Sequence, residues 1–379
     1  MILFYVQHLL GIGHFRRTLA IAEACQNEGI QVEVISGGMP VEVQPVSSVR
    51  VHQLEPLQSA DLSFSRIVDR HGEPLNEALE TVRSQELLQL FHDLRPKVLV
   101  TELFPFGRRR FQFELLPLLE AARAAGTPVL CSVRDSIQKH SKARETETAG
   151  WLRRYFEKVL VHGDAQFLPL SDSFGEFDAI ADLVLYTGFV DTTSLPTRSH
   201  EAALQDHQEV LVSAGGGKAG ELLYLAAAEA SALSTHSDIT WRILAGTSPD
   251  PHFVSRLRQL GASTLTVEAN RADFRDLLGS CRLSVSQAGY NSAVDILSSG
   301  APALFVPFAG EGGETEQPAR AQHLSAIQRV QVLREAELDG PTLAVEVDRL
   351  LAGGPPRFAP IVCDGASRSA KALKRYLAA

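Results

Sequence analysis

The residues best suited to chemistry in this 379-residue chain lie toward its C-terminal end. An apolar run, Leu283–Ser286, stops at the polar turn Gln287–Gly289, and a helical pattern begins at Asn291. The start of a helix offers free backbone N–H groups and the positive end of the helix dipole, which together favour a phosphate. Asp295 stands about one turn inside that helix, where a carboxylate can reach the hydroxyls of a ribose. The spacing therefore indicates a nucleotide-diphosphate ligand.

Two further segments of the same half suit such a ligand. The turn Ala214–Gly220 is rich in glycine, which lets the backbone approach a phosphate closely, and Lys218 adds a positive charge. The GxxxxGK[ST] pattern is absent, so this is not a P-loop, and a plain turn between strand and helix is the alternative. Glu316 and Gln317 follow another glycine-rich loop, and their acid and amide groups suit sugar hydroxyls. The alternative for this pair is the start of a surface helix.

The N-terminal half offers a candidate general base. A glycine turn ends at His14, and an imidazole there can take a proton near neutral pH. Such a base is usually oriented by a carboxylate, and Glu102 and Asp135 each follow a predicted strand. Glu102 is preferred because its strand is the more central one, and Asp135 stays open, as does a capping or packing role for His14. The residues assigned to the acceptor side of this loop are Gly11, Gly13 and Arg16.

Other motifs limit which cofactors and which kinds of acceptor are expected. No DxD pattern and no His/Cys cluster with metal spacing occurs in the sequence, so no metal or other cofactor is expected. Arginine and aromatic residues alternate over Phe104–Phe113. This run fits an acceptor or membrane-surface patch, but it is more often a helix with one face in the core and the other in solvent.

Composition excludes several classes of protein. The net charge is -9, and nucleic-acid-binding proteins usually carry a basic surface instead. The four cysteines show no CxxC spacing, which favours buried free thiols in a reducing cytosol. No signal peptide is evident, and no apolar run approaches the length of roughly 18 residues that a membrane span requires. We therefore expect a cytoplasmic protein, with peripheral membrane contact left open.

The elements that must position these residues form two similar series. Short apolar runs alternate with helical patterns in both halves, which is typical of parallel sheets covered by helices on both faces. We predict an N-terminal Rossmann-like domain over residues 1–190, a polar linker over 191–208 and a second such domain over 209–364. A helix over about 365–379 is expected to pack back on the first domain. Ligands of such sheets bind beyond the carboxyl ends of the strands, so two facing sheets predict a shared cleft. The predicted strands are Ile2–Val6, Gln31–Ile35, Val49–Leu54, Val98–Thr101, Val129–Ser132, Val159–Val161, Val210–Ser213, Thr240–Leu244, Ser263–Val267, Leu283–Ser286, Ala303–Val306 and Val330–Val332.

With these motifs in place, the whole chain resembles the GT-B superfamily of glycosyltransferases, especially the MurG-like group with a family 28-type C-terminal domain. The block Ser286–Asp295, followed by Gly300-Ala301-Pro302, is the specific part of the resemblance. The resemblance implies two doubly wound α/β domains and a metal-independent inverting transfer from a UDP-sugar, UDP-GlcNAc among the candidates. It also implies that Asp295 holds ribose, that Glu102 supports His14, and that the main chain near Arg271 faces the base. The donor-binding set implied in this way comprises Gly216, Gly217, Lys218, Arg271, Gln287, Ala288, Gly289, Asn291, Asp295, Glu316 and Gln317.

Two other functions remain open. The segment Gly11–Arg17 reads GIGHFRR, which also resembles nucleotide-sugar hydrolases of the PseG type, where the matching histidine activates water. A non-catalytic subunit that binds sugar nucleotides is the third possibility. The acceptor, a small molecule or a lipid-linked one, cannot be named from the sequence.

Overall fold

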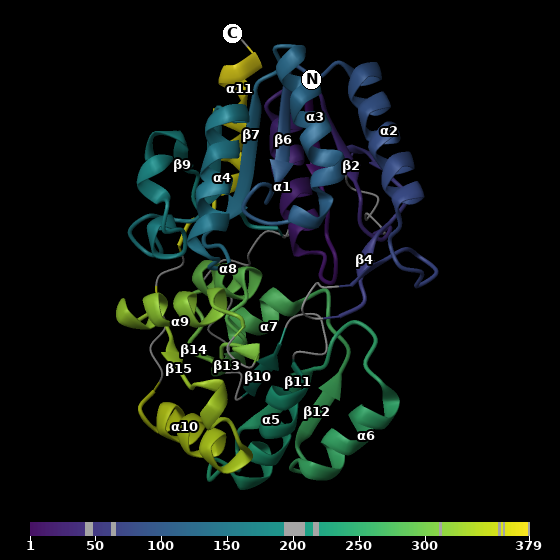
Figure 1. Cartoon of the computed structure of the whole chain (residues 1–379). Coiled ribbons are helices and arrows are strands. Elements are labelled where there is room, and N and C mark those ends of the chain that lie inside the picture. Colours follow the sequence, from purple (N-terminus) through teal and green to yellow (C-terminus); the bar gives the residue numbers. More distant parts are fainter. Residues whose placement is uncertain are drawn as a thin grey trace. The chain divides into compact units, whose positions relative to one another are not determined.

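The chain folds into two compact units (Figure 1). The structure is a computed structural model, and it describes residues 1–41, 48–61, 66–192, 209–214, 220–310, 313–354, 358 and 361–377. Unit 1 comprises Met1–Thr193 and Cys363–Ala379, and unit 2 comprises Ser194–Val362. The predicted linker lies outside the described residues from position 193 onward.

Unit 1 is built on a parallel sheet whose strand order, within the described residues, is β3-β2-β1-β6-β7-β8-β9. Alternate residues of its strands point to opposite faces, and both faces are buried. Leu3 and Tyr5 of β1 belong to a core shared with α2, α3 and α4, while Ile2 and Phe4 belong to a core shared with α1 and α11. The strands are β1 (Ile2–Val6), β2 (Val32–Ser36), β3 (Arg50–Gln53), β6 (Val98–Glu102), β7 (Val129–Arg134), β8 (Lys158–His162) and β9 (Val184–Tyr186), with the separate hairpin β4 (Gln58–Ser59) and β5 (Ile67–Val68). The helices are α1 (Gly13–Asn27), α2 (Glu77–Leu94), α3 (Gln112–Ala124), α4 (Lys142–Tyr155) and α11 (Gly365–Lys374).

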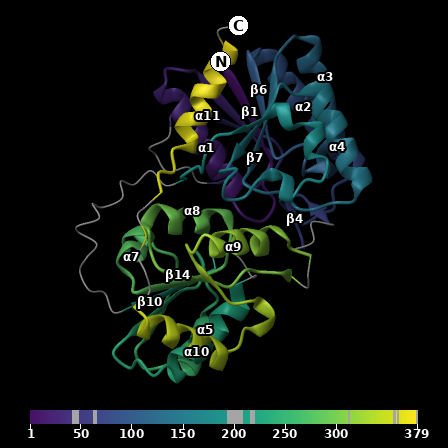
Figure 2. The same ribbon diagram turned by 90° about the vertical axis from the view of Figure 1, so that its left-hand side faces the viewer.

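The C-terminal helix belongs to unit 1 although the chain passes through unit 2 before reaching it. Helix α11 packs against α1, and the two lie side by side in Figures 1 and 2. Ala370 and Leu373 of α11 are fully buried in the core that contains Ile2 and Phe4. An isolated bridge between Val190 and Asp364 ties the start of this segment to the end of the first domain.

Unit 2 repeats the same construction with strand order β12-β11-β10-β13-β14-β15 in its described part. Val210 and Val212 of β10 pack in a core with α5, α6 and α10. The strands are β10 (Glu209–Ser213), β11 (Thr240–Leu244), β12 (Leu265–Glu268), β13 (Leu283–Ser286), β14 (Ala303–Phe305) and β15 (Gln331–Val332). The helices are α5 (Glu221–Leu233), α6 (Pro251–Leu260), α7 (Phe274–Ser280), α8 (Tyr290–Ser299), α9 (Glu316–Ala326) and α10 (Gly340–Ala352). The predicted α/β class with two parallel sheets is confirmed, and most predicted strands agree with the observed ones within two residues.

Candidate active site

The candidate base lies where the strand order of the unit 1 sheet reverses. Strands β1 and β6 are parallel neighbours, with Tyr5 in register with Thr101. After β1 the chain continues to β2, on one side of this pair, and after β6 it continues to β7, on the other side. The loops that follow β1 and β6 therefore run in opposite directions. Such a switch point is the usual ligand site of an open α/β sheet. The loop after β1 leads to His14 at the start of α1, and Glu102 is the last residue of β6.

His14 and Glu102 are in direct contact. The Nδ1 atom of His14 lies 2.9 Å from Oε1 of Glu102. Because a carboxylate only accepts hydrogen bonds, Nδ1 carries the proton and donates it. The His14 side chain is 14% exposed and that of Glu102 is 2% exposed. Among the residues that the structure describes, the side-chain contacts of His14 all use Nδ1, which leaves the lone pair of Nε2 for a substrate proton.

Arg17 completes this group from the next turn of α1. Its Nη2 donates to Oε1 of Glu102. The same Nη2 lies 3.2 Å from Nδ1 of His14, but with the proton on Nδ1 both groups are donors, so this contact is not a hydrogen bond. Burial opposes ionisation of Glu102, but the charge of Arg17 and hydrogen bonds from His14 and Ser132 lower its pKa to about 2. Burial lowers the pKa of His14 to about 3, against the raising effect of Glu102. At neutral pH the structure therefore holds an ionised carboxylate beside a neutral imidazole.

The other residues predicted for this loop take different positions. Asp135 follows β7, is 1% exposed and accepts a hydrogen bond from the backbone N–H of Ser136 at 2.9 Å. A side chain at Gly163 would collide with Cβ of Asp135, so the loops after β7 and β8 are packed tightly together. The carboxylate that contacts His14 is therefore Glu102. Gly13 begins α1, and Gly11 and Arg16 are exposed.

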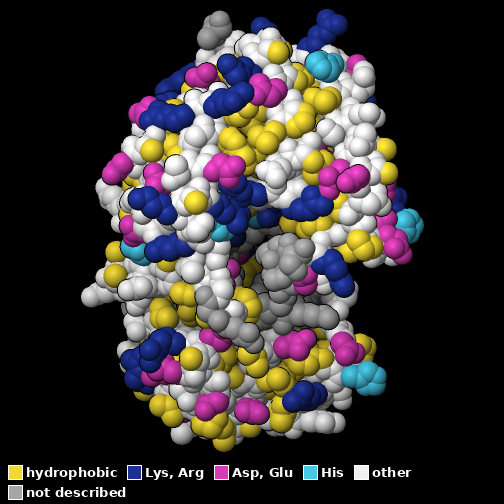
Figure 3. Space-filling view, viewed as in Figure 1, with side chains coloured by type: hydrophobic (Ala, Val, Ile, Leu, Met, Phe, Trp, Pro, Cys, Tyr) yellow, Lys and Arg dark blue, Asp and Glu magenta, His cyan; other side chains and the backbone are white. Residues whose placement is uncertain are grey.

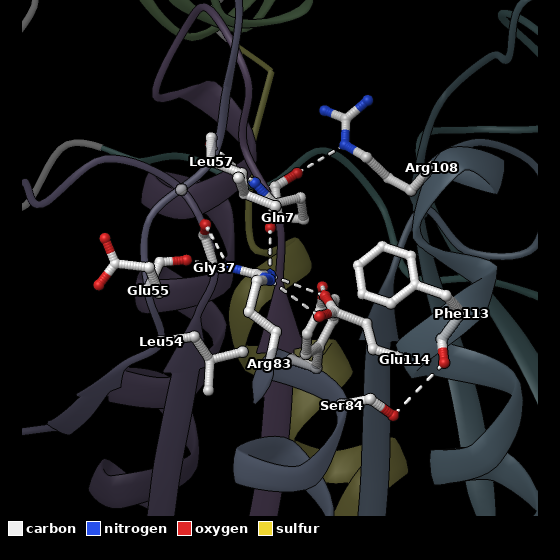
Figure 4. A network of polar contacts seen from close by, with 12 residues as sticks. Gln7, Gly37, Leu54, Glu55, Leu57, Arg83, Ser84, Arg108, Phe113 and Glu114 are labelled. Carbon is white, nitrogen blue, oxygen red and sulfur yellow. Dashed lines mark hydrogen bonds and ion pairs between the residues drawn. The ribbon is translucent and has the colours of Figure 1, made fainter. Parts of the chain in front are cut away.

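A second buried network fixes the loop that leads to His14 (Figure 4). Arg83 of α2 and Glu114 of α3 are both 0% exposed and form two hydrogen bonds, of 2.9 and 2.7 Å. Arg83 also donates to the side chain of Gln7, 3.1 Å away, and to backbone carbonyls of the loops after β2 and β3. From the other side, Nε of Arg108 donates to the Gln7 carbonyl at 2.6 Å. One arginine thus joins the loops after three neighbouring strands.

The switch point of the unit 2 sheet lies between β10 and β13, which are parallel neighbours with Ser213 in register with Ser286. The turn Gln287–Gly289 follows β13 and leads into α8, whose N-cap is Gly289. Among the described residues, no side chain caps this helix start, and its first turn holds no acidic residue. The backbone N–H groups at the start of α8 are therefore suited to an anionic ligand. Asn291 is half-buried in this first turn.

Asp295 is engaged by an arginine that the sequence analysis did not single out. Nε and Nη2 of Arg275, on α7, lie 3.0 and 2.8 Å from Oδ1 of Asp295. The two side chains are 9% and 17% exposed. Arg320 of α9 donates to the carbonyl of Ala288 at 2.8 Å and so anchors the turn before α8. Asp295, the residue predicted to bind ribose, therefore lies in a group of three helices, α7, α8 and α9, whose side chains are held by hydrogen bonds.

The loop after β14 and the start of α9 carry the predicted sugar-binding pair. Glu316 is buried, and Oε1 of Gln317 accepts a hydrogen bond from the backbone N–H of Phe308 at 3.1 Å. Two hydroxyl oxygens near this end of the sheet, on Ser286 and Thr315, are buried without a hydrogen-bond partner among the described residues. A polar ligand or an ordered water could satisfy buried polar atoms of this kind.

Three of the predicted donor-binding residues, Gly216, Gly217 and Lys218, lie outside the described residues. Arg271 is 38% exposed and forms an ion pair with Asp273 at 2.7 Å. Hydrogen bonding to Asp273 and its charge raise the pKa of Arg271. In the described part of the chain no group of three or more His, Cys, Asp or Glu side chains is arranged to hold a metal ion.

Two arginines that contact predicted site residues were not predicted from the sequence: Arg17, which contacts Glu102, and Arg275, which contacts Asp295. The signal for Arg17 was its spacing of three residues from His14, which places both on one face of a helix. The signal for Arg275 was weaker, because α7 is a short helix and its contact with Asp295 depends on tertiary packing.

The aromatic residues of Phe104–Phe113 are mostly core. Phe104, Phe106 and Phe111 are at most 2% exposed, while the arginines between them lie at the surface or half-buried. On the face drawn in Figure 3, Lys and Arg side chains are interspersed with acidic and apolar ones. Within the described residues, no helix is long and apolar enough to cross a bilayer.

Two family models match this chain. A glycosyl transferase 4-like domain matches residues 13–177, and a glycosyltransferase family 28 C-terminal domain matches residues 209–376. No curated protein matches it in sequence. The structure is similar to that of MurG from Acinetobacter baumannii, with a TM-score of 0.61 and 15% identity over 98% of this chain and 94% of that one.

Two glycosyltransferases solved with ligands are similar as well. One is VinC in complex with dTDP, with a TM-score of 0.58 and 14% identity over 100% of this chain and 96% of VinC. The other is UGT2 of Phytolacca americana, complexed with UDP-2-fluoro-glucose and pterostilbene. Its TM-score is 0.56, with 14% identity over 99% of this chain and 94% of that one. At this level of identity the likeness shows a shared fold.

The fold and the two family matches together define the class of protein: the chain is a glycosyltransferase of the GT-B type. Within that class it combines a glycosyl transferase 4-like N-terminal domain with a glycosyltransferase family 28 C-terminal domain.

Proposed function

We propose that this protein is an inverting glycosyltransferase that moves a sugar from a nucleotide-diphosphate donor, foremost a UDP-sugar such as UDP-GlcNAc, to an acceptor hydroxyl. The observation that carries the proposal is the contact between Nδ1 of His14 and Glu102 at the switch point of the unit 1 sheet. It leaves Nε2 as a base whose tautomer and direction are fixed.

In this mechanism unit 1 supplies the base. Nε2 of His14 removes the proton of the acceptor hydroxyl, and the oxygen attacks the anomeric carbon as the bond to the diphosphate breaks. The imidazolium that forms is stabilised by Glu102, which is already ionised and hydrogen-bonded to Nδ1. The low pKa of His14 before substrate binding keeps the base unprotonated at neutral pH.

Unit 2 supplies the donor-binding residues. The uncapped start of α8 and Lys218 would take the charge of the departing diphosphate without a metal ion. Asp295 would accept hydrogen bonds from ribose, and Glu316 and Gln317 would bind the sugar. The unpartnered hydroxyls of Ser286 and Thr315 in the described residues support a polar ligand at this edge. The dTDP and UDP-sugar bound by VinC and by Phytolacca americana UGT2 make both UDP and dTDP donors worth testing.

The test compares His14→Asn with a matched control, His52→Gln. Asparagine keeps an N–H near the position of Nδ1 but has no basic nitrogen. His52 also contacts a carboxylate, Glu33, and its side chain is 15% exposed against 14% for His14. We expect His14→Asn to lower kcat by about 10²- to 10⁴-fold, the usual contribution of a general base, and His52→Gln to stay near wild type. Full activity in His14→Asn would overturn the assignment.

Nucleotide release measured with and without acceptor separates transfer from hydrolysis. A screen of UDP- and dTDP-sugars by thermal shift first identifies the donor, and release is then followed over a panel of acceptors. Acceptor-dependent release supports a transferase. Rapid release in water alone supports the PseG-type hydrolase, in which His14 activates water. Binding without turnover under every condition supports a non-catalytic subunit.

A further inference from the structure

A continuous chain of buried hydrogen bonds runs from Glu102 away from His14 and across two further strands. Oγ of Ser132 on β7 lies 2.5 Å from Oε2 of Glu102, and the two residues are in register. On the other side, Oγ of Ser132 lies 2.9 Å from Nε2 of His162 at the end of β8. Nδ1 of His162 lies 2.8 Å from Oγ1 of Thr187, which follows β9. All four side chains are at most 2% exposed.

The direction of each bond follows from what each group can donate. Glu102 is an acceptor, so the single O–H of Ser132 points to Glu102. Oγ of Ser132 must then accept from His162, so the proton of His162 is on Nε2. In a neutral ring Nδ1 of His162 is therefore an acceptor. The O–H of Thr187 points to it at 2.8 Å rather than to the Val161 carbonyl, which lies 3.4 Å from the same oxygen. Ser369 of α11 lies 3.5 Å from the same nitrogen, but its O–H is given to the Gly365 carbonyl at 2.6 Å.

The chain fixes both oxygens of Glu102. Oε1 takes His14 and Arg17, and Oε2 takes Ser132, so the carboxylate cannot rotate without breaking a buried hydrogen bond. Because Nε2 of His162 donates to Oγ of Ser132, the Ser132 O–H has no acceptor on that side and stays directed at Glu102. The two histidines thus occur as opposite tautomers, with the proton on Nδ1 in His14 and on Nε2 in His162.

We propose that Ser132 and His162 are positioning residues that lock Glu102, and through it the catalytic base, into one orientation. The inference rests on the proposed role of His14. It assigns a function to the Ser132 and His162 side chains, which contact no substrate in this arrangement. A misplaced base loses rate rather than binding, because binding does not depend on its direction.

The first test needs no substrate. The full-length protein is labelled with ¹⁵N-histidine, and nitrogen–carbon-proton correlation spectra are recorded at pH 7. His14→Asn and His162→Gln assign the two signals by their loss. We expect the Nδ1–H tautomer for His14 and the neutral Nε2–H tautomer for His162. An Nδ1–H tautomer or a cationic ring at His162 would overturn the proposal.

The second test is kinetic. Ser132→Ala should lower kcat by about 10- to 100-fold, the range expected for a misplaced catalytic group, with donor KM changed by less than about twofold. His162→Gln, whose amide N–H can still donate to Ser132, should retain more activity than His162→Phe. The control is Ser173→Ala, which removes another buried hydroxyl of unit 1, one that donates to Leu170. Its kcat should stay near wild type.

The outcomes distinguish the two proposals. If His14→Asn is inactive but folded Ser132→Ala keeps wild-type kcat, the positioning role is wrong and the base assignment stands. If His14→Asn is fully active, the proposed function fails, while the tautomer of His162 is still read from the spectra. A Ser132→Ala variant that changes only KM also contradicts the positioning role.

Discussion

The two sheet edges differ in how their polar groups are satisfied. In unit 1, Glu102 receives hydrogen bonds from His14, Arg17 and Ser132, and Arg83 joins three loops around Gln7. In unit 2, the start of α8 has no side-chain cap, and the hydroxyls of Ser286 and Thr315 are buried without a partner among the described residues. The contrast is between one carboxylate and one helix start: three side chains hold Glu102, and none of the described residues caps α8. It does not extend to every polar group, because Nδ1 of His8 in unit 1 is also buried without a partner in the described part of the chain.

This difference agrees with the two proposed roles, which are to orient a base in unit 1 and to bind the sugar nucleotide in unit 2. A base must be oriented before the substrate arrives, so its partners are built into the protein. A diphosphate brings its own acceptors, so the backbone N–H groups of a helix start can stay without a side-chain cap until it binds. Asp295 differs from these groups, because Arg275 already holds its carboxylate. Substitutions in the polar network of unit 1 should therefore change stability or kcat, and those at the unit 2 edge should change nucleotide binding.

The largest effect on stability is expected at Arg83. Arg83→Met leaves the carboxylate of Glu114 buried without its guanidinium partner, and breaking a buried ion pair in this way costs about 3–5 kcal/mol. Urea unfolding is followed in a Trp241→Phe background, in which Trp151 reports on unit 1 alone.

The control for Arg83 is Arg110→Met. Arg110 pairs with Glu80 at the surface, with 52% of its side chain exposed, and such exposed pairs contribute about 0–1 kcal/mol. Equal losses in the two variants would show that the buried network does not hold the unit 1 loops.

Substitution of Asp295 is expected to have a smaller effect, and the quantity that it changes is the free energy of nucleotide binding. Asp295→Ala removes a charged acceptor for ribose and should weaken UDP binding by about 1.5–3 kcal/mol. Isothermal titration with UDP and dTDP measures this change, and thermal melting confirms that the variant is folded. Asp276→Ala removes an exposed carboxylate from the same cluster of helices and serves as the control. An unchanged Kd in Asp295→Ala would count against the placement of the nucleotide.

Much of the fold could be predicted because its strands are covered on both faces. Such strands are short continuous apolar runs, and β1 and β13 were predicted with their observed bounds. Helix α4 was harder to predict, because few residues of its sequence KARETETAGWLRRY are apolar and only a narrow stripe around Ala149 and Leu152 is buried. The hairpin of β4 and β5 is two residues per strand, too short to give a period.

The candidate site was only partly visible in the sequence. His14 and Glu102 could be paired because each follows a central strand, and the ends of parallel strands meet at one edge. Ser132 could not be singled out, since a serine inside an apolar strand looks like a packing residue until the register with Glu102 is known. Arg17 looked like its exposed neighbour Arg16, because only the rotation of α1 against the sheet decides which of them is buried.

The effect that builds up most gradually is the pH dependence of the stability of unit 1. Burial lowers the pKa of both His14 and His162 to about 3, so the unfolded chain binds protons at these positions below pH 6.5 while the folded unit does not. The contribution of these two histidines to the free energy of unfolding is therefore fully present above about pH 6.5 and is lost as the pH falls below it. Each histidine contributes a slope of at most about 1.4 kcal/mol per pH unit between pH 6.5 and 3. Urea unfolding of the Trp241→Phe protein from pH 7.5 to 5 measures this slope. His162→Gln should reduce it by about 1 kcal/mol per pH unit, and an unchanged slope would mean that His162 is not held neutral by the buried chain.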